Sequence, residues 1–430
     1  MTQTRGESGA AAGPLPLIGL AGWLLAALAF FYAWVLRVSP SVMVEQLMAD
    51  FNVSGAILGN LSAFYFYAYA ALQMPVGIAH DRFGPRRVLT ATLLVAGAGC
   101  VLFGLAPTVE VAYLGRALIG FGSAFGFVGS MVLAAAWFPA RRFALFSGLA
   151  LGLGIFGGVG GQAPLAYLVE AQGWRASMVM LSGGALVLSI LTWLVVRDRP
   201  AAAAGDAHPS PPAPIRAEFR RVTRRPQTLL ISLYALLIAA PPLAFGGLWG
   251  VPYTMQVYGQ GRPAAAFTVS FILFGYLIGG PAWGWLSDRW GRRKAPLVIA
   301  AAFCAVTLGA ALFGPDLTLS QFRALLFLNG FGGAAMSVSY ALVREHNAAS
   351  GTGAALGLVN MSAVAGGAIF QPVVGFLLDR YWDGTLVAGA RVYGAEAYLD
   401  AFLILPALYG GAVLVGLLTR ETWCRPMGVP

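Results

Sequence analysis

Three arginines lie inside long apolar segments of this 430-residue chain, where a charged side chain is costly to bury. They are Arg37, Arg116 and Arg323. None of the 17 acidic residues lies in the middle of such a segment, so the sequence offers these cations no internal counter-ion. A guanidinium group suits a carboxylate or phosphate, which its planar fork can bind through two parallel hydrogen bonds. We therefore expect a binding site for a small organic anion.

The three arginines differ in how strongly they predict such a site. Apolar sequence continues beyond Arg37 through Val42, so we expect Arg37 to bind the substrate. Arg116 opens the element Arg-x-x-x-Gly-x-Gly, and a substrate-binding role and a structural role are both open for it. Arg323 lies a few residues inside its segment, where its long side chain can extend to the membrane surface, so it is a weak site residue.

Polar and aromatic side chains recur at helical spacing in other apolar segments, where they could supply the rest of the site. Residues three or four positions apart share one face of a helix and can contact the same ligand. Packing between helices and an aromatic belt at the membrane surface are the alternative interpretations. The predicted substrate-binding residues of this kind are Tyr65, Tyr69, Gln73, Trp249, Tyr253, Asn329 and Asn360.

The elements that carry these residues are predicted to be membrane-spanning helices. Hydrophobic residues make up 58% of the chain and charged residues only 10%, too few to keep a globule of this size in solution. A helix needs about 20 apolar residues to cross a bilayer. Twelve segments meet or approach that length: 10–36, 51–79, 88–109, 111–140, 143–169, 176–196, 226–261, 263–287, 295–315, 317–343, 347–378 and 401–419. We therefore expect an all-α integral membrane protein with twelve helices.

Charge predicts the orientation of these helices. If the connecting loops alternate between the two sides, one side holds 20 of the 27 basic residues and the other holds only Arg175, Arg262, Arg380 and Arg391. We therefore expect a multi-pass protein of the cell inner membrane, and the positive-inside rule predicts that both of its termini lie in the cytoplasm. This bias explains the net charge of +10, so we expect the lipid bilayer as partner and no nucleic acid.

One loop element occurs twice. Gly77-x-x-x-Asp81-Arg82-Phe83-Gly84-x-Arg86-Arg87 returns 207 residues later as Gly284-x-x-x-Asp288-Arg289-Trp290-Gly291-x-Arg293-Lys294. The element resembles the loop signature between the second and third helices of each half of the Major Facilitator Superfamily. That resemblance implies that the aspartate, with its glycines and basic neighbours, acts as a latch that holds one conformation closed. The alternative interpretation, a marker of cytoplasmic loops, fits a single copy better than two.

The repeat divides the chain into two halves. We expect an N-terminal six-helix bundle over residues 1–197, a proline-rich cytoplasmic linker over 198–226, and a C-terminal six-helix bundle over 227–430. Two pseudo-symmetric bundles around a central cavity follow from such a repeat, and we expect a monomer. Glycine-rich stretches in the fifth and eleventh segments end at Gln162 and Gln371, each near a proline. These stretches depart from the Gly-Pro ending of the superfamily's antiporter branch, which favours helix packing over drug efflux.

The first segment resembles a particular branch of the superfamily. Leu36-Arg37-Val38-Ser39-Pro40-Ser41-Val42 is similar to the first helix of the anion:cation symporters and organophosphate exchangers, whose arginine binds the substrate anion. The resemblance implies cation-coupled import of a small anion that bears a carboxylate. The symporters carry an aspartate before that arginine where this chain has Leu36, and the seventh segment lacks the exchangers' second arginine, which disfavours a doubly charged phosphate ester. A drug or metabolite efflux antiporter and a transporter-like membrane sensor are the alternatives.

The sequence is least informative about coupling. Glu45 is the acid nearest Arg37, about two helical turns further along, and is the predicted coupling group for a proton or another cation. A solvated acid outside the membrane is the alternative interpretation. We find no nucleotide-binding loop, nucleophile triad or metal-ligand cluster in the sequence, so we expect no enzyme, no cofactor and no metal site.

Overall fold

A computed structural model describes residues 17–73, 75–198, 220–347 and 352–427. The first half contains α1 (Leu17–Val38), α2 (Val44–Phe51), α3 (Gly55–Ala71), α4 (Pro75–Phe83), α5 (Pro85–Gly104), α6 (Val109–Ser123), α7 (Gly126–Trp137), α8 (Ala140–Gly160) and α9 (Ala163–Val195). The second half contains α11 (Pro226–Ala244), α12 (Gly250–Tyr258), α13 (Arg262–Val269), α14 (Phe271–Trp290), α15 (Lys294–Phe313), α16 (Leu319–Gly333), α17 (Met336–Glu345), α18 (Thr352–Arg380), β1 (Leu386–Val387), β2 (Ala390–Arg391), α19 (Ala395–Phe402) and α20 (Ile404–Leu418). Residues 10–16 of the first expected span and 199–219 of the expected linker lie outside the described residues.

The described helices confirm the expected all-α membrane fold. Ten segments are long and apolar enough to span a bilayer, and one of them, Leu145–Val195, contains two crossings. At Gly173 the backbone leaves helical geometry, with φ 79°, a conformation that glycine adopts readily, and the chain turns back. The short helices α3 and α4 together make a further crossing, from Gly55 to Phe83. These assignments agree with the twelve expected crossings.

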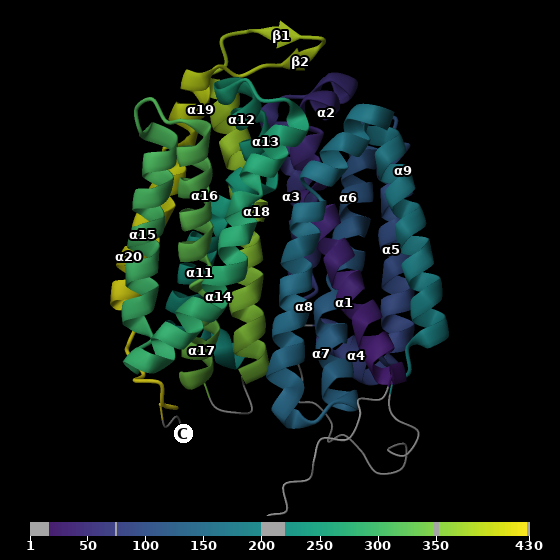
Figure 1. The fold of residues 1–430 in the computed structure, drawn as a ribbon, viewed down its shortest axis with the longest axis vertical. Helices are drawn as coiled ribbons and strands as arrows, with labels where there is room; N and C mark the ends of the chain where they lie inside the picture. Colours follow the sequence, from purple (N-terminus) through teal and green to yellow (C-terminus); the bar gives the residue numbers. More distant parts are fainter. Residues whose placement is uncertain (1–16, 74, 199–219, 348–351, 428–430) are drawn as a thin grey trace, which may run out of the picture.

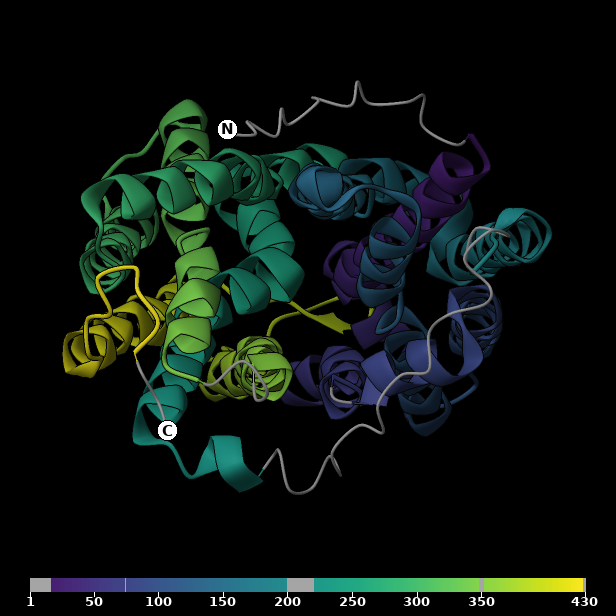
Figure 2. The same ribbon diagram turned by 90° about the horizontal axis from the view of Figure 1, so that it is seen from below.

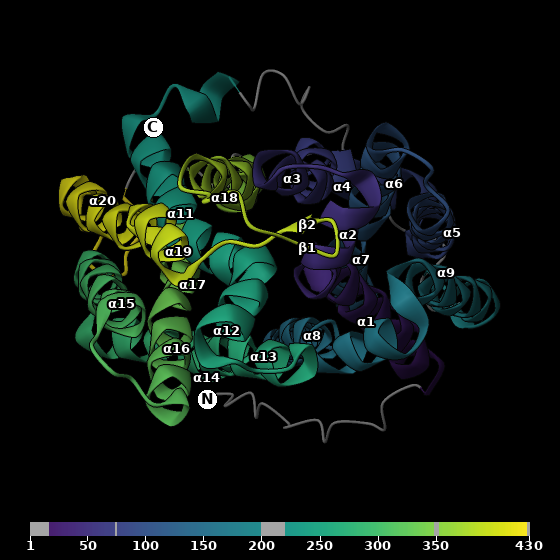
Figure 3. The ribbon, with the colours of Figure 1, turned by 90° about the horizontal axis from the view of Figure 1, so that it is seen from above.

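The helices form two bundles that stand side by side (Figure 1). Seen along the helices, α1 to α9 make one group and α11 to α20 the other (Figures 2 and 3). We call the end that carries the start of α1, both repeated loops and the C-terminal segment the termini end, and the opposite end the hairpin end. The β1–β2 hairpin lies across the hairpin end and reaches α2 of the other bundle (Figure 3).

Proline removes a backbone donor near the end of the first crossing, Leu17–Val42, and near the middle of the crossing Pro226–Tyr258. Pro40 has no N–H to give to the carbonyl of Leu36, and α1 continues as a tighter 3-10 turn over Ser39–Val42. In the second half, Pro241 and Pro242 precede a π-helical turn over Phe245–Trp249, which links α11 to α12. Such turns leave carbonyl groups free for side chains, and in both places the chain uses them.

Candidate substrate-binding site

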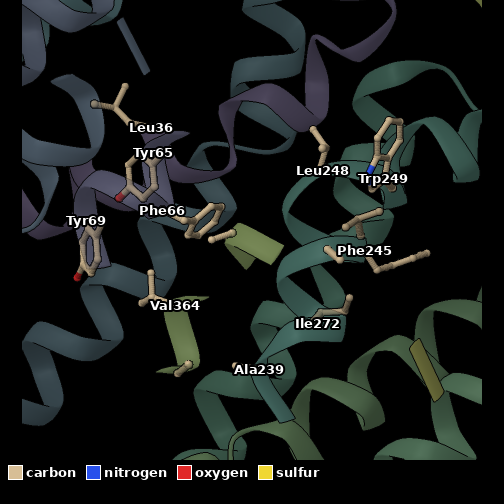
Figure 4. Close-up of a cluster of buried hydrophobic side chains, with 14 of the residues drawn as sticks. Leu36, Tyr65, Phe66, Tyr69, Ala239, Phe245, Leu248, Trp249, Ile272 and Val364 are labelled. Carbon is tan, nitrogen blue, oxygen red and sulfur yellow. The ribbon is translucent and has the colours of Figure 1, made fainter. Parts of the chain in front are cut away.

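Arg37 lies in a cage of aromatic rings. Its guanidinium carbon lies 4.4 Å from the ring centroid of Trp34, 4.9 Å from that of Tyr69 and 5.7 Å from that of Tyr65. The side chain is nearly buried, with 7% exposed. Tyr65 and Tyr69 lie one turn apart on α3 with their rings stacked, and Figure 4 shows them on the same side of that helix. Cation–π contact stabilises the charge without neutralising it.

Two N–H donors in this cage have no acceptor among the described residues. Within the part of the chain that the structure describes, the Nε of Arg37 and the indole Nε1 of Trp34 are buried and make no hydrogen bond. No ion pair joins Arg37 to an acid of the described residues. A buried donor without a partner costs about 1–3 kcal/mol, more when it is charged. A bound anion would supply the missing acceptors, so the geometry supports the expected role of Arg37.

Below the cage, toward the termini end, polar side chains join the two bundles. Gln73 donates to the carbonyl of Tyr69 at 3.3 Å and accepts a hydrogen bond from the amide of Asn360 at 2.5 Å. Asn360 in turn accepts from the hydroxyl of Tyr340 at 2.9 Å. The structure therefore brings together five predicted residues, Arg37, Tyr65, Tyr69, Gln73 and Asn360, although four come from the first bundle and one from the second.

The surroundings of the two tyrosines are otherwise apolar. Phe66 of α3 and Val364 of α18 lie nearest to them, and Phe245, Leu248 and Ile272 lie further away in the second bundle (Figure 4). The ring of Phe245 packs within that bundle against Tyr253 and Phe402. All of these side chains are buried. An anion held by Arg37 would therefore meet that cation, a few hydrogen-bonding groups and the apolar side chains of Phe66 and Val364.

Arg116 lies next to the cage, with its guanidinium carbon 5.2 Å from the ring centroid of Tyr65, and two of its three nitrogens are bonded. Its Nε, like that of Arg37, is buried and has no hydrogen-bond partner among the described residues. Arg116 is fully buried and donates from Nη1 to the carbonyl of Leu36 at 2.9 Å and from Nη2 to the carbonyl of Ser62 at 3.5 Å. The Leu36 carbonyl is the one that Pro40 leaves without its helical donor. These two contacts anchor the interrupted end of α1 and support the structural role. The substrate-binding role of Arg116 stays a prediction, because its Nε is free to donate.

Three further predicted residues make contacts within the second bundle. Asn329 bonds the carbonyl of Cys304 at 3.1 Å and accepts from Tyr409 at 3.1 Å. Trp249 donates to the carbonyl of Gln371 at 3.0 Å. Tyr253 packs among aromatic rings, including those of Phe245, Tyr398 and Phe402. These contacts are those of helix packing, the alternative interpretation of such stripes.

Glu45 makes an ion pair, but its partner is not Arg37. The Oε2 atom of Glu45 lies 3.0 Å from Nη2 of Arg262, which begins α13 in the other bundle. Arg323 lies at the hairpin end and donates to the hydroxyl of Thr268 at 3.0 Å, consistent with the weak site role expected for it. Both contacts belong to the hairpin end, away from the aromatic cage.

Sequence reasoning missed two residues that contact the candidate site. Trp34 lies one turn before Arg37 on α1, so helical spacing from Arg37 was a signal that could have found it. Tyr340 on α17 gave no such signal, because its role depends on a hydrogen bond to Asn360 of another helix.

Comparison with known proteins decides the family. A sequence profile of the Major Facilitator Superfamily matches residues 22–262 and again residues 243–418. The chain belongs to the Major Facilitator Superfamily. It is a transporter-family protein of two repeated halves and not an enzyme.

Relatives of this superfamily member span nearly its whole length. A probable sulfoacetate transporter of Cupriavidus necator is 24% identical over 87% of this chain and 91% of its own. The membrane sensor protein UhpC of Escherichia coli is 26% identical over 90% of each chain. The crystal structure of a bacterial homologue of the human lysosomal transporter Spinster, inward-facing and occupied, superposes with a TM-score of 0.75, at 16% identity over 95% of this chain and 98% of that one. At this low sequence identity, the structural similarity shows a shared fold and no more.

The two copies of the superfamily loop differ in their contacts. In the second copy, Arg293 lies 2.6 Å from Asp288 and 2.9 Å from Glu345, a buried acid at the end of α17. Burial alone would lower the pKa of Arg293, but its hydrogen bonds to Glu345 and Asp288 and the charge of Glu345 raise that pKa above its ordinary value. Glu421 caps the start of α15 by accepting from the backbone N–H groups of Arg293 and Lys294.

The first copy has a smaller network. The backbone N–H of Arg86 donates to Asp198 at 2.8 Å, as that of Arg293 does to Glu421, and the side chain of Arg86 bonds the carbonyl of Trp193. Among the described residues no hydrogen bond reaches the carboxylate of Asp81, which is exposed. The latch role expected for the two loops stays a prediction, and in this structure the first latch is not engaged with a described residue.

Proposed function

We propose that this protein is a secondary active transporter that carries a small organic anion by alternating access, with Arg37 binding the anionic group. The observation that carries the proposal is the buried guanidinium of Arg37. Its Nε and the Nε1 of the neighbouring Trp34 indole have no acceptor among the described residues. An anion that binds there gains charge-assisted hydrogen bonds in a site from which water is largely excluded. The relative named a probable sulfoacetate transporter supports an anionic substrate.

The composition of the site favours an anion with a single charge and a compact or apolar body. Among the described residues, Arg37 is the cation that lies against Trp34 and Tyr69, while Arg116, which lies 5.2 Å from the Tyr65 ring, already donates to two carbonyls. The neighbours of the two tyrosines, Phe66 and Val364, are apolar, so a second negative charge would have no cation of its own (Figure 4). Burying that unpaired charge costs far more than burying an uncharged group. A monocarboxylate or monosulfonate fits this site better than a dicarboxylate or a phosphate ester.

We further propose cation-coupled import across the inner membrane, with both termini in the cytoplasm. The excess of basic residues on the loops of the termini end supports this orientation, because such loops stay on the cytoplasmic side. The resemblance of the first helix to the anion:cation symporters supports import. Efflux of a cationic drug is disfavoured, because a cationic substrate would meet the positive charge of Arg37 in the aromatic cage and no acid of the described residues.

Binding and uptake measured together test the proposal. Purified protein in nanodiscs is screened by thermal shift against sulfoacetate, monocarboxylates, dicarboxylates and a cationic dye, and the compounds that stabilise it are then tested for uptake into proteoliposomes. We expect the monocarboxylates to stabilise the parent protein more than sulfoacetate and the dicarboxylates, which carry two negative charges, and we expect no stabilisation of Arg37→Gln. Stabilisation by the cationic dye alone would contradict the proposal.

A membrane sensor is the second candidate, because the sensor UhpC is similar over nine-tenths of the chain. The same proteoliposomes distinguish the two functions. A transporter accumulates the anion that stabilises it, whereas a sensor binds that anion through Arg37 and leaves it outside the vesicles.

A further inference from the structure

Asp379, near the end of α18 in the second bundle, caps the first turn of α3 in the first bundle. Its Oδ1 accepts from the backbone N–H of Gly55 at 2.9 Å, and its Oδ2 accepts from that of Ala56 at 2.8 Å. The first N–H groups of a helix lack partners within the helix and carry partial positive charge. A carboxylate at this position is therefore well bound, and here it joins two segments 324 residues apart.

The chain after α18 surrounds the same carboxylate. Tyr393 donates its hydroxyl to Asp379 at 2.7 Å, and Arg391 of β2 lies 3.1 Å away. Only 16% of the Asp379 side chain is exposed. The β1–β2 hairpin thus holds in place the acid that bonds the other bundle, which gives the loop between α18 and α19 a defined role at this contact.

The backbones of α3 and α18 touch directly beneath this cap. A Cβ atom added to Gly375 would collide with the carbonyl of Gly55, and one added to Gly59 would lie 2.6 Å from the Cα of Pro372. Glycine is required at such a contact because a side chain would force the helices apart. Tyr67 of α3 adds a hydrogen bond at 3.2 Å to the Ala368 carbonyl, which Pro372 leaves without its helical donor. The interface is closed at the hairpin end.

We propose that Asp379 is a latch that holds the hairpin end of the α3–α18 interface closed, the counterpart of Asp81 at the opposite end. The crossing formed by α3 and α4 runs antiparallel to α18 (Figure 1). Asp81, near the end of α4, therefore lies at the end of the interface where α18 begins, and Asp379, near the end of α18, lies where α3 begins. Asp379 is engaged in this structure, whereas no described residue bonds the carboxylate of Asp81. During alternating access, Asp379 would lose its hydrogen bonds as the hairpin end opens, and Asp81 would gain partners as the termini end closes.

At the second interface between the bundles, the described residues form no such latch. By the 209-residue offset that relates the glycine-rich stretches of the two halves, Glu170 of α9 is the equivalent of Asp379, and it is exposed. The helix that α9 meets, α13, begins with Arg262 and Pro263, and proline has no N–H to donate. Arg262 pairs with Glu45 instead. The two halves are thus asymmetric at the hairpin end.

Distances between spin labels test the latch in the full chain. Labels at Thr108 and Ser320 report the separation of the bundles, because both residues are exposed at the hairpin end of their own bundle. Cys100 and Cys304 are buried, so Cys424→Ser leaves the two introduced cysteines for labelling. Electron–electron distances are then measured in nanodiscs for the parent, Asp379→Asn and Asp383→Asn. Asp383 is the matched control, because it is exposed and bonds the backbone N–H of Thr385 in its own loop.

We expect Asp379→Asn to add a population with longer distances at the hairpin end, while Asp383→Asn matches the parent. Tyr393→Phe removes one donor to the carboxylate and should cause a smaller shift in the same direction, which keeps the test informative if Asp379→Asn does not fold. Unchanged distributions in both variants would overturn the latch. The measurement uses no substrate, so its outcome is independent of whether the transported anion has been identified correctly.

Discussion

The indole ring of Trp34 lies 4.4 Å from the guanidinium carbon of Arg37, one turn along the same helix, and within the described chain neither Nε1 of the indole nor Nε of the guanidinium has an acceptor. Buried donors without acceptors are rare in folded proteins. In a transporter, such donors are expected where the substrate accepts their hydrogen bonds. This pair therefore identifies the part of the fold where the substrate anion is expected.

We expect Arg37→Lys to lose transport while the protein remains folded and inserted. Lysine keeps the charge but cannot reproduce the planar fork or the stacking on Trp34, and losing one charge-assisted hydrogen bond costs about 1.5–3 kcal/mol, roughly tenfold to a hundredfold in affinity. Uptake into proteoliposomes and thermal stability are measured on the same preparation. Arg323→Lys is the control, since Arg323 lies away from the cage and should tolerate lysine. Near-normal uptake by Arg37→Lys would place Arg37 outside the substrate site.

We expect Glu45→Gln to keep exchange of substrate across the membrane and to lose accumulation driven by a pH gradient, if Glu45 carries the coupling proton. The structure adds a second variant, because Glu45 pairs with Arg262 of the other bundle. Arg262→Gln leaves the carboxylate able to bind a proton, so it should weaken closure of the hairpin end yet retain some accumulation. Equal accumulation by the parent and Glu45→Gln would assign coupling to another group or to the substrate's own acid.

We expect Glu345→Gln to destabilise the protein far more than Asp288→Asn does. Both acids pair with Arg293, but the Glu345 side chain is 5% exposed and that of Asp288 is 69% exposed. Removing one partner of a buried pair leaves an uncompensated charge and costs about 3–5 kcal/mol, whereas an exposed pair contributes little. Thermal unfolding in detergent or nanodiscs measures the difference. Similar losses in the two variants would contradict a network centred on the buried acid.

We expect Asp81→Asn and Asp379→Asn to shift the conformational equilibrium in opposite directions. The two acids belong to opposite ends of the α3–α18 interface, so weakening Asp81 should favour the state with the hairpin end closed, and weakening Asp379 should favour the other state. The spin-label pair at Thr108 and Ser320 reads both. Asp288→Asn serves for comparison, because its partner Arg293 lies in the same bundle. A shift of the same sign in the first two variants would rule out opposing latches.

Much of the architecture was predictable because it depends on local properties of the chain. Apolar segments of about 20 residues predict membrane helices wherever they occur, and the repeated loop at Asp81 and Asp288 predicts two related halves without any knowledge of contacts. The importance of Arg37 was also predictable, since a cation in an apolar segment without a nearby acid requires a partner from elsewhere.

The sequence by itself determined the number and kind of helices, the division into halves and the lone cation of the first crossing. Only the tertiary structure decided which side chains meet, because an apolar segment specifies insertion into the bilayer but not the rotation of its helix toward a particular neighbour. Asn360 meets Gln73 across 287 residues, and Asp379 meets Gly55 across 324. The rotation of the helix that carries Asn329 was likewise not specified by the sequence. Asn329 was expected in the site, and in the structure it bonds Cys304 and Tyr409 within the second bundle. Contacts of this range arise from close packing of two bundles, which spacing along the chain does not encode.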